Sequence, residues 1–215
     1  MVATLGSFYR LYKFKLSWTR LQSEIRTCLR NLPAKLDDNF SGILKRVEAQ
    51  PPSERDLAQR VLIWIAHAKR LLKLNELLHG LAVRPGEFNV DEDKLPCEDL
   101  LVEYCLGLAQ IDPDSSIIRL VHFKLQEYFE RRSQLFFPNG HSDIAQACLT
   151  YLCLDAFSSG PCLSDEEYEH RTEIWPFLQY AAQYWGDHAR EDLKEGYKSL
   201  AVELCSNSQN LGCAI

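Results

Sequence analysis

Apolar residues recur at helical spacing along most of the chain. Phe40, Ile43, Leu44 and Val47, for example, follow one another at intervals of three and four residues, which places them in one stripe along a helix. Similar stripes predict further helices over 21–29, 57–68, 74–81, 100–108, 144–152, 174–185 and 193–204. Ser53 is expected to cap the helix that carries the 57–68 stripe, with Asp56 at the reciprocal position. The chain is therefore predicted to be mainly α-helical.

The hydrophobic period changes between residues 108 and 121. Two short β-rich runs, 108–111 and 117–121, flank a turn of Asp, Pro and Ser residues. This composition favours a tight turn, so the segment predicts a two-stranded β-hairpin, here called the wing. Helices before and after it, all within 53–132, favour a winged-helix domain over an ordinary helical bundle. Because two strands alone are marginally stable, the wing must pack on the helices.

Turn-forming residues divide the predicted helices into regions. Pro51-Pro52 ends one helix, and Asn139-Gly140 separates the winged helix from a second helical region. A loop is expected over 157–171, around Ser158-Ser159-Gly160-Pro161. The resulting prediction is an N-terminal helical segment, a winged-helix domain flanked by helical segments, a helical connector and a disordered tail, over 1–50, 51–133, 140–205 and 206–215 respectively.

The charge pattern argues against nucleic acid as the main partner. The chain carries a formal net charge of -6, whereas nucleic-acid affinity rests largely on Lys and Arg. The helix before the wing, the one that many winged helices insert into DNA, holds Glu98, Asp99 and Glu103 and no Lys or Arg. The first thirty residues are basic, which suits a solvated helix, an organellar presequence, an anionic membrane surface or an acidic neighbouring domain. No apolar run is long enough to insert into a membrane, so we expect a cytoplasmic protein.

Eight cysteines suggest a supply of disulfides or metal ligands. None of them forms a C-x-x-C pair, and six lie within helical patterns. Since buried cysteine behaves as a small hydrophobe and zinc sites need closely paired ligands, we predict free core thiols and no metal site. The six cysteines in helical patterns are Cys28, Cys97, Cys105, Cys148, Cys153 and Cys205.

Several short motifs together resemble a known family. Trp64-Ile65-Ala66 with Lys69-Arg70, and Val121-His122-Phe123 with Gln126-Glu127-Tyr128, are similar to the winged helix of the GPI inositol-deacylase type. That domain follows the NACHT nucleotide-binding module in fungal STAND proteins. Later segments, above all 176–188, look like the connector that leads into ankyrin or other repeats in such proteins. The resemblance covers roughly residues 21–189 and implies a regulatory role in signal transduction.

The resemblance also implies a role for one histidine. In such proteins a histidine at the start of the helix after the wing contacts the β-phosphate of bound ADP, and His122 matches that position. A helix start offers unpaired N–H groups and a positive dipole end, and an imidazole adds a further donor. Gln126, one turn later, is placed to support the ring. The alternative is that His122 only satisfies a neighbouring backbone carbonyl.

The nucleotide-binding core of such a switch is missing from these 215 residues. No glycine-rich loop ends in Gly-Lys-Ser/Thr, so we expect no ATP hydrolysis and no cofactor, with ADP or ATP present only where another chain or a missing segment supplies a NACHT domain. The chain then represents a product without NACHT, a protein whose partner supplies the NTPase, or an incomplete gene model. The expected partner is a protein: a NACHT NTPase, a repeat domain or a second copy.

A hydrolase and a free-standing adaptor are the two alternatives to a regulatory module. A hydrolase needs Gly-x-Ser-x-Gly after a strand, and the nearest match, around Ser158, lacks both the first glycine and the strand. His141, His170 and His188 stand near acidic residues, but no nucleophile with a matching base can be identified. We therefore expect no enzyme. A free-standing protein–protein adaptor without any link to nucleotide remains the alternative.

Overall fold

The computed structural model describes residues 36–84, 86, 89–91, 95–191 and 194–213, without the side chains of residues 133 and 134. The predicted helix over 21–29, the basic N-terminal residues, Cys28 and Leu193 lie outside the described residues. The chain divides into two compact units, Met1–Lys45 and Arg46–Ile215. Residues 36–45 of the first unit are helical, as the Phe40 stripe predicts. All that follows concerns the second unit.

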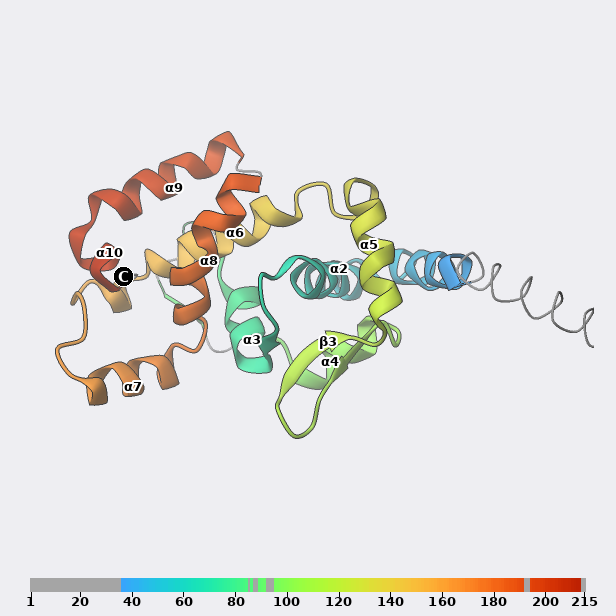
Figure 1. Cartoon of the computed structure of the whole chain (residues 1–215), viewed down its shortest axis with the longest axis horizontal. Coiled ribbons are helices and arrows are strands. Elements are labelled where there is room, and N and C mark those ends of the chain that lie inside the picture. The colour runs from blue at the N-terminus through green and yellow to red at the C-terminus, as the bar shows by residue number, and fades with distance from the viewer. Residues whose placement is uncertain (1–35, 85, 87–88, 92–94, 192–193, 214–215) are drawn as a thin grey trace, which may run out of the picture. The chain divides into compact units, whose positions relative to one another are not determined.

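Three helices lie between Pro51 and the wing within the described residues (Figure 1). They are α2 (Pro52–His67), α3 (Leu74–Ala82) and α4 (Glu98–Tyr104). The predicted cap of α2 was wrong: the N-cap residue is Pro51, two residues before Ser53, and no side chain caps the helix. Pro52 suits the first position of the helix because its missing N–H would have no intrahelical partner there. Helix α4 is shorter than its apolar pattern because Leu106 and Gly107 take positive φ angles of 50° and 83°.

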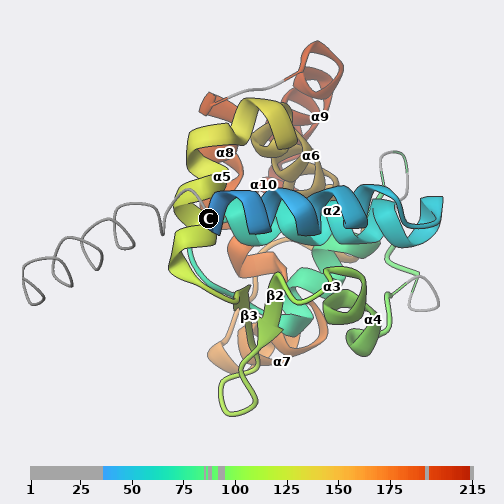
Figure 2. The same ribbon diagram turned by 90° about the vertical axis from the view of Figure 1, so that its right-hand side faces the viewer.

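The wing forms as predicted, and a third strand joins it. Strands β2 (Ala109–Ile111) and β3 (Ile117–Leu120) are antiparallel and lie side by side in Figures 1 and 2. In the turn between them, the Asp112 carboxylate accepts hydrogen bonds from the backbone N–H groups of Asp114 and Ser115. Strand β1 (Leu72–Lys73), which the sequence did not predict, pairs with the other edge of β3. The sheet therefore has three strands in the order β1-β3-β2.

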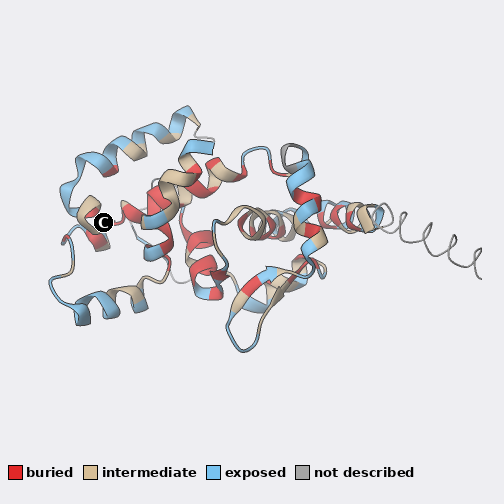
Figure 3. Cartoon of the chain, in the orientation of Figure 1, coloured by how far each residue is buried: buried red, intermediate tan, exposed pale blue. Residues whose placement is uncertain are grey.

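The chain then continues through three helices that carry much of the core. These are α5 (Phe123–Phe136), α6 (Gly140–Leu152) and α8 (Leu178–Glu191). Buried residues are concentrated on α3 and α6 (Figure 3). The Trp64 ring of α2 contacts Phe177 and Tyr180 edge-on, with centroids 5.3 and 6.0 Å apart. The helices before the wing and those of the predicted connector therefore share one apolar core, which explains why they belong to a single unit.

Two expectations for the C-terminal third need correction. The loop predicted over 157–171 contains the end of a 3₁₀ turn, Asp155–Phe157, and most of a regular helix, α7 (Asp165–Ile174). After α9 (Glu195–Ser206), the tail expected to be disordered forms α10 (Ser208–Cys213). Buried Asn210 holds α10 in place by donating hydrogen bonds to the carbonyls of Leu152 and Leu154.

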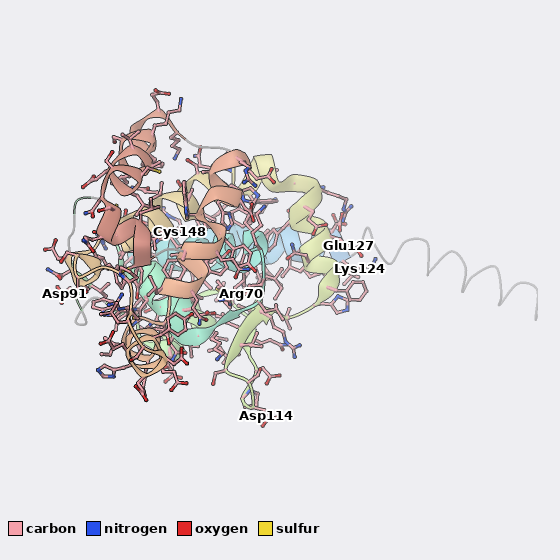
Figure 4. The ribbon with its side chains drawn as sticks, turned by 60° about the vertical axis from the view of Figure 1, so that its left-hand side comes forward. Arg70, Asp91, Asp114, Lys124, Glu127 and Cys148 are labelled. Atoms are coloured by element: carbon pink, nitrogen blue, oxygen red, sulfur yellow. The ribbon has the colours of Figure 1, made fainter. Side chains whose placement is uncertain are left out.

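The cysteines of the described part are all free. Cys105 and Cys148 are buried core thiols, as predicted, and burial raises the pKa of Cys105 to about 12 and that of Cys148 still further. Figure 4 places Cys148 among the packed helices. Cys97 and Cys205 are exposed, so the prediction fails for those two. Among the described residues, no helix has the length and apolar character that crossing a membrane requires.

Candidate functional site

His122 lies where the wing passes into α5. Its side chain is exposed. Its Nδ1 atom accepts a hydrogen bond from the backbone N–H of Lys124 at 3.0 Å, so the imidazole itself caps the first turn of α5. Because Nδ1 accepts this bond, the neutral ring carries its proton on Nε2. The junction therefore presents an imidazole donor beside the positive end of α5, whose regular helical geometry runs from Phe123 to a kink at Arg132.

A groove of about 560 Å³ lies beside this histidine. One wall comes from the end of α2 and the segment up to β1, and the other comes from β3 and the start of α5. Three apolar side chains here are unusually exposed: Leu71 at 61%, Val121 at 44% and Phe123 at 66%. The His122 ring stacks on that of Phe123, with centroids 4.6 Å apart. The site thus combines one imidazole with an apolar rim.

Gln126 does not support the imidazole as expected. Its side-chain amide donates to the carbonyl of Ala66 at 3.0 Å and to the carboxylate of Glu130 at 3.1 Å. The bond to Ala66 ties α5 to the C-terminal end of α2. Gln126 therefore lines the groove and fixes one of its walls, while His122 is held by the backbone of its own helix.

The charged groups around the groove are largely paired within the protein. Arg70 makes a bidentate contact with Glu76, at 2.6 and 2.8 Å. Arg119 lies 3.5 Å from Asp112, whose pKa is lowered by hydrogen bonds from Ser115 and by the arginine. Figure 4 shows Arg70 in the body of the protein and Asp114 at the tip of the wing. Of these groups, only Arg119 is a loosely held cation that an incoming anion can recruit.

The outer face of α5 carries another ion pair. Lys124 Nζ lies 2.8 Å from a carboxylate oxygen of Glu127, and Figure 4 places both residues together on this helix. The same ammonium group stands 5.0 Å from the centre of the Phe123 ring. Lys124 is therefore engaged twice and is poorly placed to reach a ligand.

The residues considered for hydrolysis do not form a catalytic set. The Ser158 hydroxyl donates to the backbone carbonyl of Asp155 at 2.7 Å, with no imidazole as partner. Asp143 pairs with Lys194 and Asp187 pairs with Arg190. The described structure therefore gives Ser158 no base.

A histidine cluster that the sequence did not predict joins three helices. His141 Nδ1 of α6 lies 2.9 Å from His188 Nδ1 of α8, and His188 Nε2 lies 2.9 Å from the Tyr180 hydroxyl. His67 of α2 packs edge-on against His141, with ring centroids 4.9 Å apart. The cluster thus connects α2 with the two central helices of the connector. Only the i, i+8 spacing of Tyr180 and His188 within one helix hinted at any of these contacts.

Tyr180 favours one set of hydrogen-bond directions in the cluster. Its oxygen accepts the backbone N–H of Lys69 at 3.0 Å, so its own proton is free to go to His188 Nε2. The neutral His188 then carries its proton on Nδ1 and donates it to His141. Burial, followed by the positive charges of His141, Lys69 and His67, lowers the pKa of His188 to about 3. Burial also lowers the pKa of His67.

These histidines do not form a metal centre. Within the described residues, no group of three or more His, Cys, Asp or Glu side chains is arranged to hold a metal ion. The cluster binds helices to one another through hydrogen bonds and ring contacts.

Comparison with known proteins agrees with this geometry. Residues 47–145 match the sequence model of the GPI inositol-deacylase, winged helix domain. These residues form a winged-helix domain. The match spans α2 to the first turn of α6, so His122 and its groove lie inside it. The predicted mainly helical fold is confirmed, and the sheet has three strands instead of the predicted two.

One curated relative is a fungal protein. It is described as "Azaphilone pigments biosynthesis cluster protein L" of Monascus ruber and is 28% identical over 195 residues, which cover 83% of this chain. The match covers only 40% of the relative's own length. No solved structure matches the chain.

Proposed function

We propose that the chain is a non-catalytic regulatory module of a NACHT-type nucleotide switch. In this role the winged-helix domain meets a nucleotide bound by another polypeptide segment, and His122 contacts its β-phosphate. The observation that carries the proposal is the exposed imidazole held by Lys124 N–H at the start of α5. Donation from Nε2, together with the helix dipole, favours an anion at this place.

Three further features support this role. The nearby Arg119 is half-exposed and only loosely paired with Asp112, at 3.5 Å, which leaves it able to turn towards a phosphate. Leu71 and Phe123 surround the groove with apolar surface, which suits contact with another protein segment. The curated relative extends well beyond the matched region, as expected if this module works beside other segments.

The proposal assigns neither an enzymatic activity nor DNA binding. Ser158, the serine at the centre of the hydrolase-like motif, hydrogen bonds to a backbone carbonyl. Helix α4, which precedes the wing, exposes Glu98, Asp99 and Glu103, and these carboxylates would repel a phosphate backbone.

Titration of the purified chain with ADP tests the proposal. NMR of the imidazole C–H groups should show that ADP and pyrophosphate shift the His122 signals, with weak, millimolar affinity, and that AMP shifts them less. The matched variant is His122→Asn, because asparagine keeps a capping acceptor for Lys124 N–H while removing the imidazole. We expect this variant to bind ADP about tenfold more weakly.

His170→Asn serves as the control, because His170 is exposed on α7. It should bind ADP as the unmodified chain does. Equal ADP affinity in the chain and in His122→Asn, with both melting at the same temperature, would contradict a phosphate contact by His122.

A second candidate function is that of an adaptor without nucleotide, acting through a second copy of the chain. It is favoured by the exposed side chains of Leu71, Val121 and Phe123. Sedimentation of the chain at increasing concentration tests this function. An adaptor of this kind should dimerise, and Phe123→Ser should abolish the dimer without affecting the fold. A chain that stays monomeric at all concentrations would remove this candidate.

A further inference from the structure

A second groove, of about 440 Å³, lies on a different part of the protein. It is bounded by α2, by the end of α3 with the residues that follow it, and by α6, and it shares no lining residue with the His122 groove. Its volume falls within the range of small-molecule sites, which is about 300–1,000 Å³. The lining residues that matter most here are Arg60, Trp64, Arg84, Gln146 and Thr150.

Two guanidinium groups face this groove. Arg60 of α2 donates to the carbonyl of Leu81, which anchors one side of its guanidinium to the end of α3. Burial lowers the pKa of Arg60, and the positive charge of Arg84 lowers it further. Arg84 is exposed and forms no ion pair with the described residues. The two arginines therefore repel one another across a shared space.

Two carboxylates, Asp56 and Asp143, line the same groove as these arginines. Asp56 lies 2.9 Å from Arg55, and Asp143 lies 3.1 Å from Lys194. Asp143 partly offsets the charge of Arg60, but each of these carboxylates already has its own cation. The two arginines and two aspartates of the lining balance one another, and a positive excess arises only with the partner cations: Arg55, Arg60, Arg84 and Lys194 then stand against two carboxylates.

Apart from the two arginines, Asp56, Asp143 and Gln146, the lining is largely apolar, and it holds one unsatisfied hydroxyl. Trp64, only 4% exposed, supplies an aromatic wall, and Ile144 and Ala147 of α6 extend it. Thr150, 3% exposed, has a buried hydroxyl that lacks a hydrogen-bond partner. A buried hydroxyl without a partner costs free energy, so an acceptor that reached the floor of the groove would be stabilised there.

We propose that this groove binds a small organic anion, a carboxylate or a phosphate ester, with its charged group between Arg60 and Arg84 and its apolar body against Trp64. Guanidinium groups bind both kinds of anion through paired N–H donors. The apolar wall selects for an organic body, which free phosphate or sulfate lacks. This inference does not depend on the proposed role of His122.

Calorimetric titration of the full chain tests this inference with four probes: benzoate, phenyl phosphate, inorganic phosphate and sulfate. At least one of the two aromatic anions should bind at least tenfold more tightly than the inorganic anions. Preference for benzoate would identify the carboxylate class, and preference for phenyl phosphate would identify the phosphate ester class. Arg84→Gln should weaken binding of the preferred probe about tenfold without changing the melting temperature, because Arg84 is exposed and unpaired within the described chain.

Two variants complete the test. Thr150→Val is nearly isosteric and should weaken binding a few-fold while leaving the free protein as stable as before, or more stable. Arg190→Gln is the control, since the Arg190 side chain is 81% exposed on α8 and, among the described residues, pairs with Asp187 away from this groove. It should bind the probes unchanged. Absence of aromatic-anion binding at 10 mM, equal binding of inorganic phosphate, or full binding by Arg84→Gln would each overturn the inference.

Discussion

Acid should weaken this protein through His188. The residue is 0% exposed, and both of its ring nitrogens are engaged, by His141 and by Tyr180. Its pKa is about 3 in the folded chain, whereas an unfolded histidine has a pKa of about 6.5. Below pH 6.5 the unfolded chain therefore binds a proton that the folded chain refuses. The stabilisation is fully present above about pH 6.5 and is lost as the pH falls towards 3.

The size of the effect follows from these two pKa values. At 1.4 kcal/mol per pH unit, lowering the pH from 7.5 to 5 should reduce the free energy of unfolding by about 2 kcal/mol through His188 alone. His67 adds to the loss, because its pKa is also lowered by burial. A charge at His188 would in addition face the positive Lys69. The nearby Glu191 offers little compensation, because it is exposed and already lies 3.4 Å from Lys69.

Urea unfolding at pH 7.5 and at pH 5, followed by tryptophan fluorescence, measures this loss. His188→Gln keeps a polar side chain in the cluster but cannot titrate. This variant should be less stable than the unmodified chain at pH 7.5. Its free energy of unfolding should fall by about 2 kcal/mol less than that of the unmodified chain when the pH is lowered to 5. His170→Gln, at an exposed position on α7, should keep the full pH dependence. The reasoning is refuted if His188→Gln and the unmodified chain lose the same free energy between the two pH values.

Three further predictions concern the packing of the second unit. Gly80→Ala should lower the free energy of unfolding by about 1–2 kcal/mol, because the added methyl group would meet the Trp64 ring at 3.1 Å. Gly196→Ala, in α9, is the matched variant: its methyl group would meet nothing within 4 Å, so it should be neutral or stabilising. Thermal melting compares the two variants. Asn210→Ala should lower stability by about 2 kcal/mol and release α10, which hydrogen exchange of its amides would detect, since two hydrogen bonds to buried carbonyls are lost. Cys148→Ser should cost about 1–3 kcal/mol in urea unfolding, because its hydroxyl would replace a fully buried thiol.

The elements that the sequence predicted are those with a local signal. The wing was found because an Asp-Pro-Asp-Ser-Ser turn stands between two β-rich runs, and Asp112 closes that turn in the structure. Strand β1 was missed because two residues carry no periodicity, and their partners in β3 lie 44 to 46 positions later. Helix α7 was missed for another reason. It buries none of its residues, so it has no apolar stripe, although Ser164 caps it through Glu167 N–H. The Ser-x-x-Glu spacing was the available signal.

In the candidate site, too, local features could be predicted from the sequence and contacts between distant helices could not. The position of His122 could be predicted because a helix start after a strand is a local feature, but the role of Gln126 depended on α2, whose end lies sixty residues earlier. The histidine cluster is entirely a product of packing. His67, His141 and His188 come from three helices, and no spacing in the sequence brings them together.

His67 connects the histidine cluster to the end of α2 that α5 contacts. Ala66 accepts the Gln126 bond from α5, and the next residue, His67, contacts the connector through His141. A shift of α5 caused by a phosphate at His122 would therefore act on the end of α2, one residue away from the cluster. Because interiors are close-packed and do not deform continuously, such a displacement would bear on the contact of His67 with His141 of α6. In the proposed switch, the end of α2 would thus be one physical link between the candidate sensing site and the connector, beside the direct chain connection from α5 to α6.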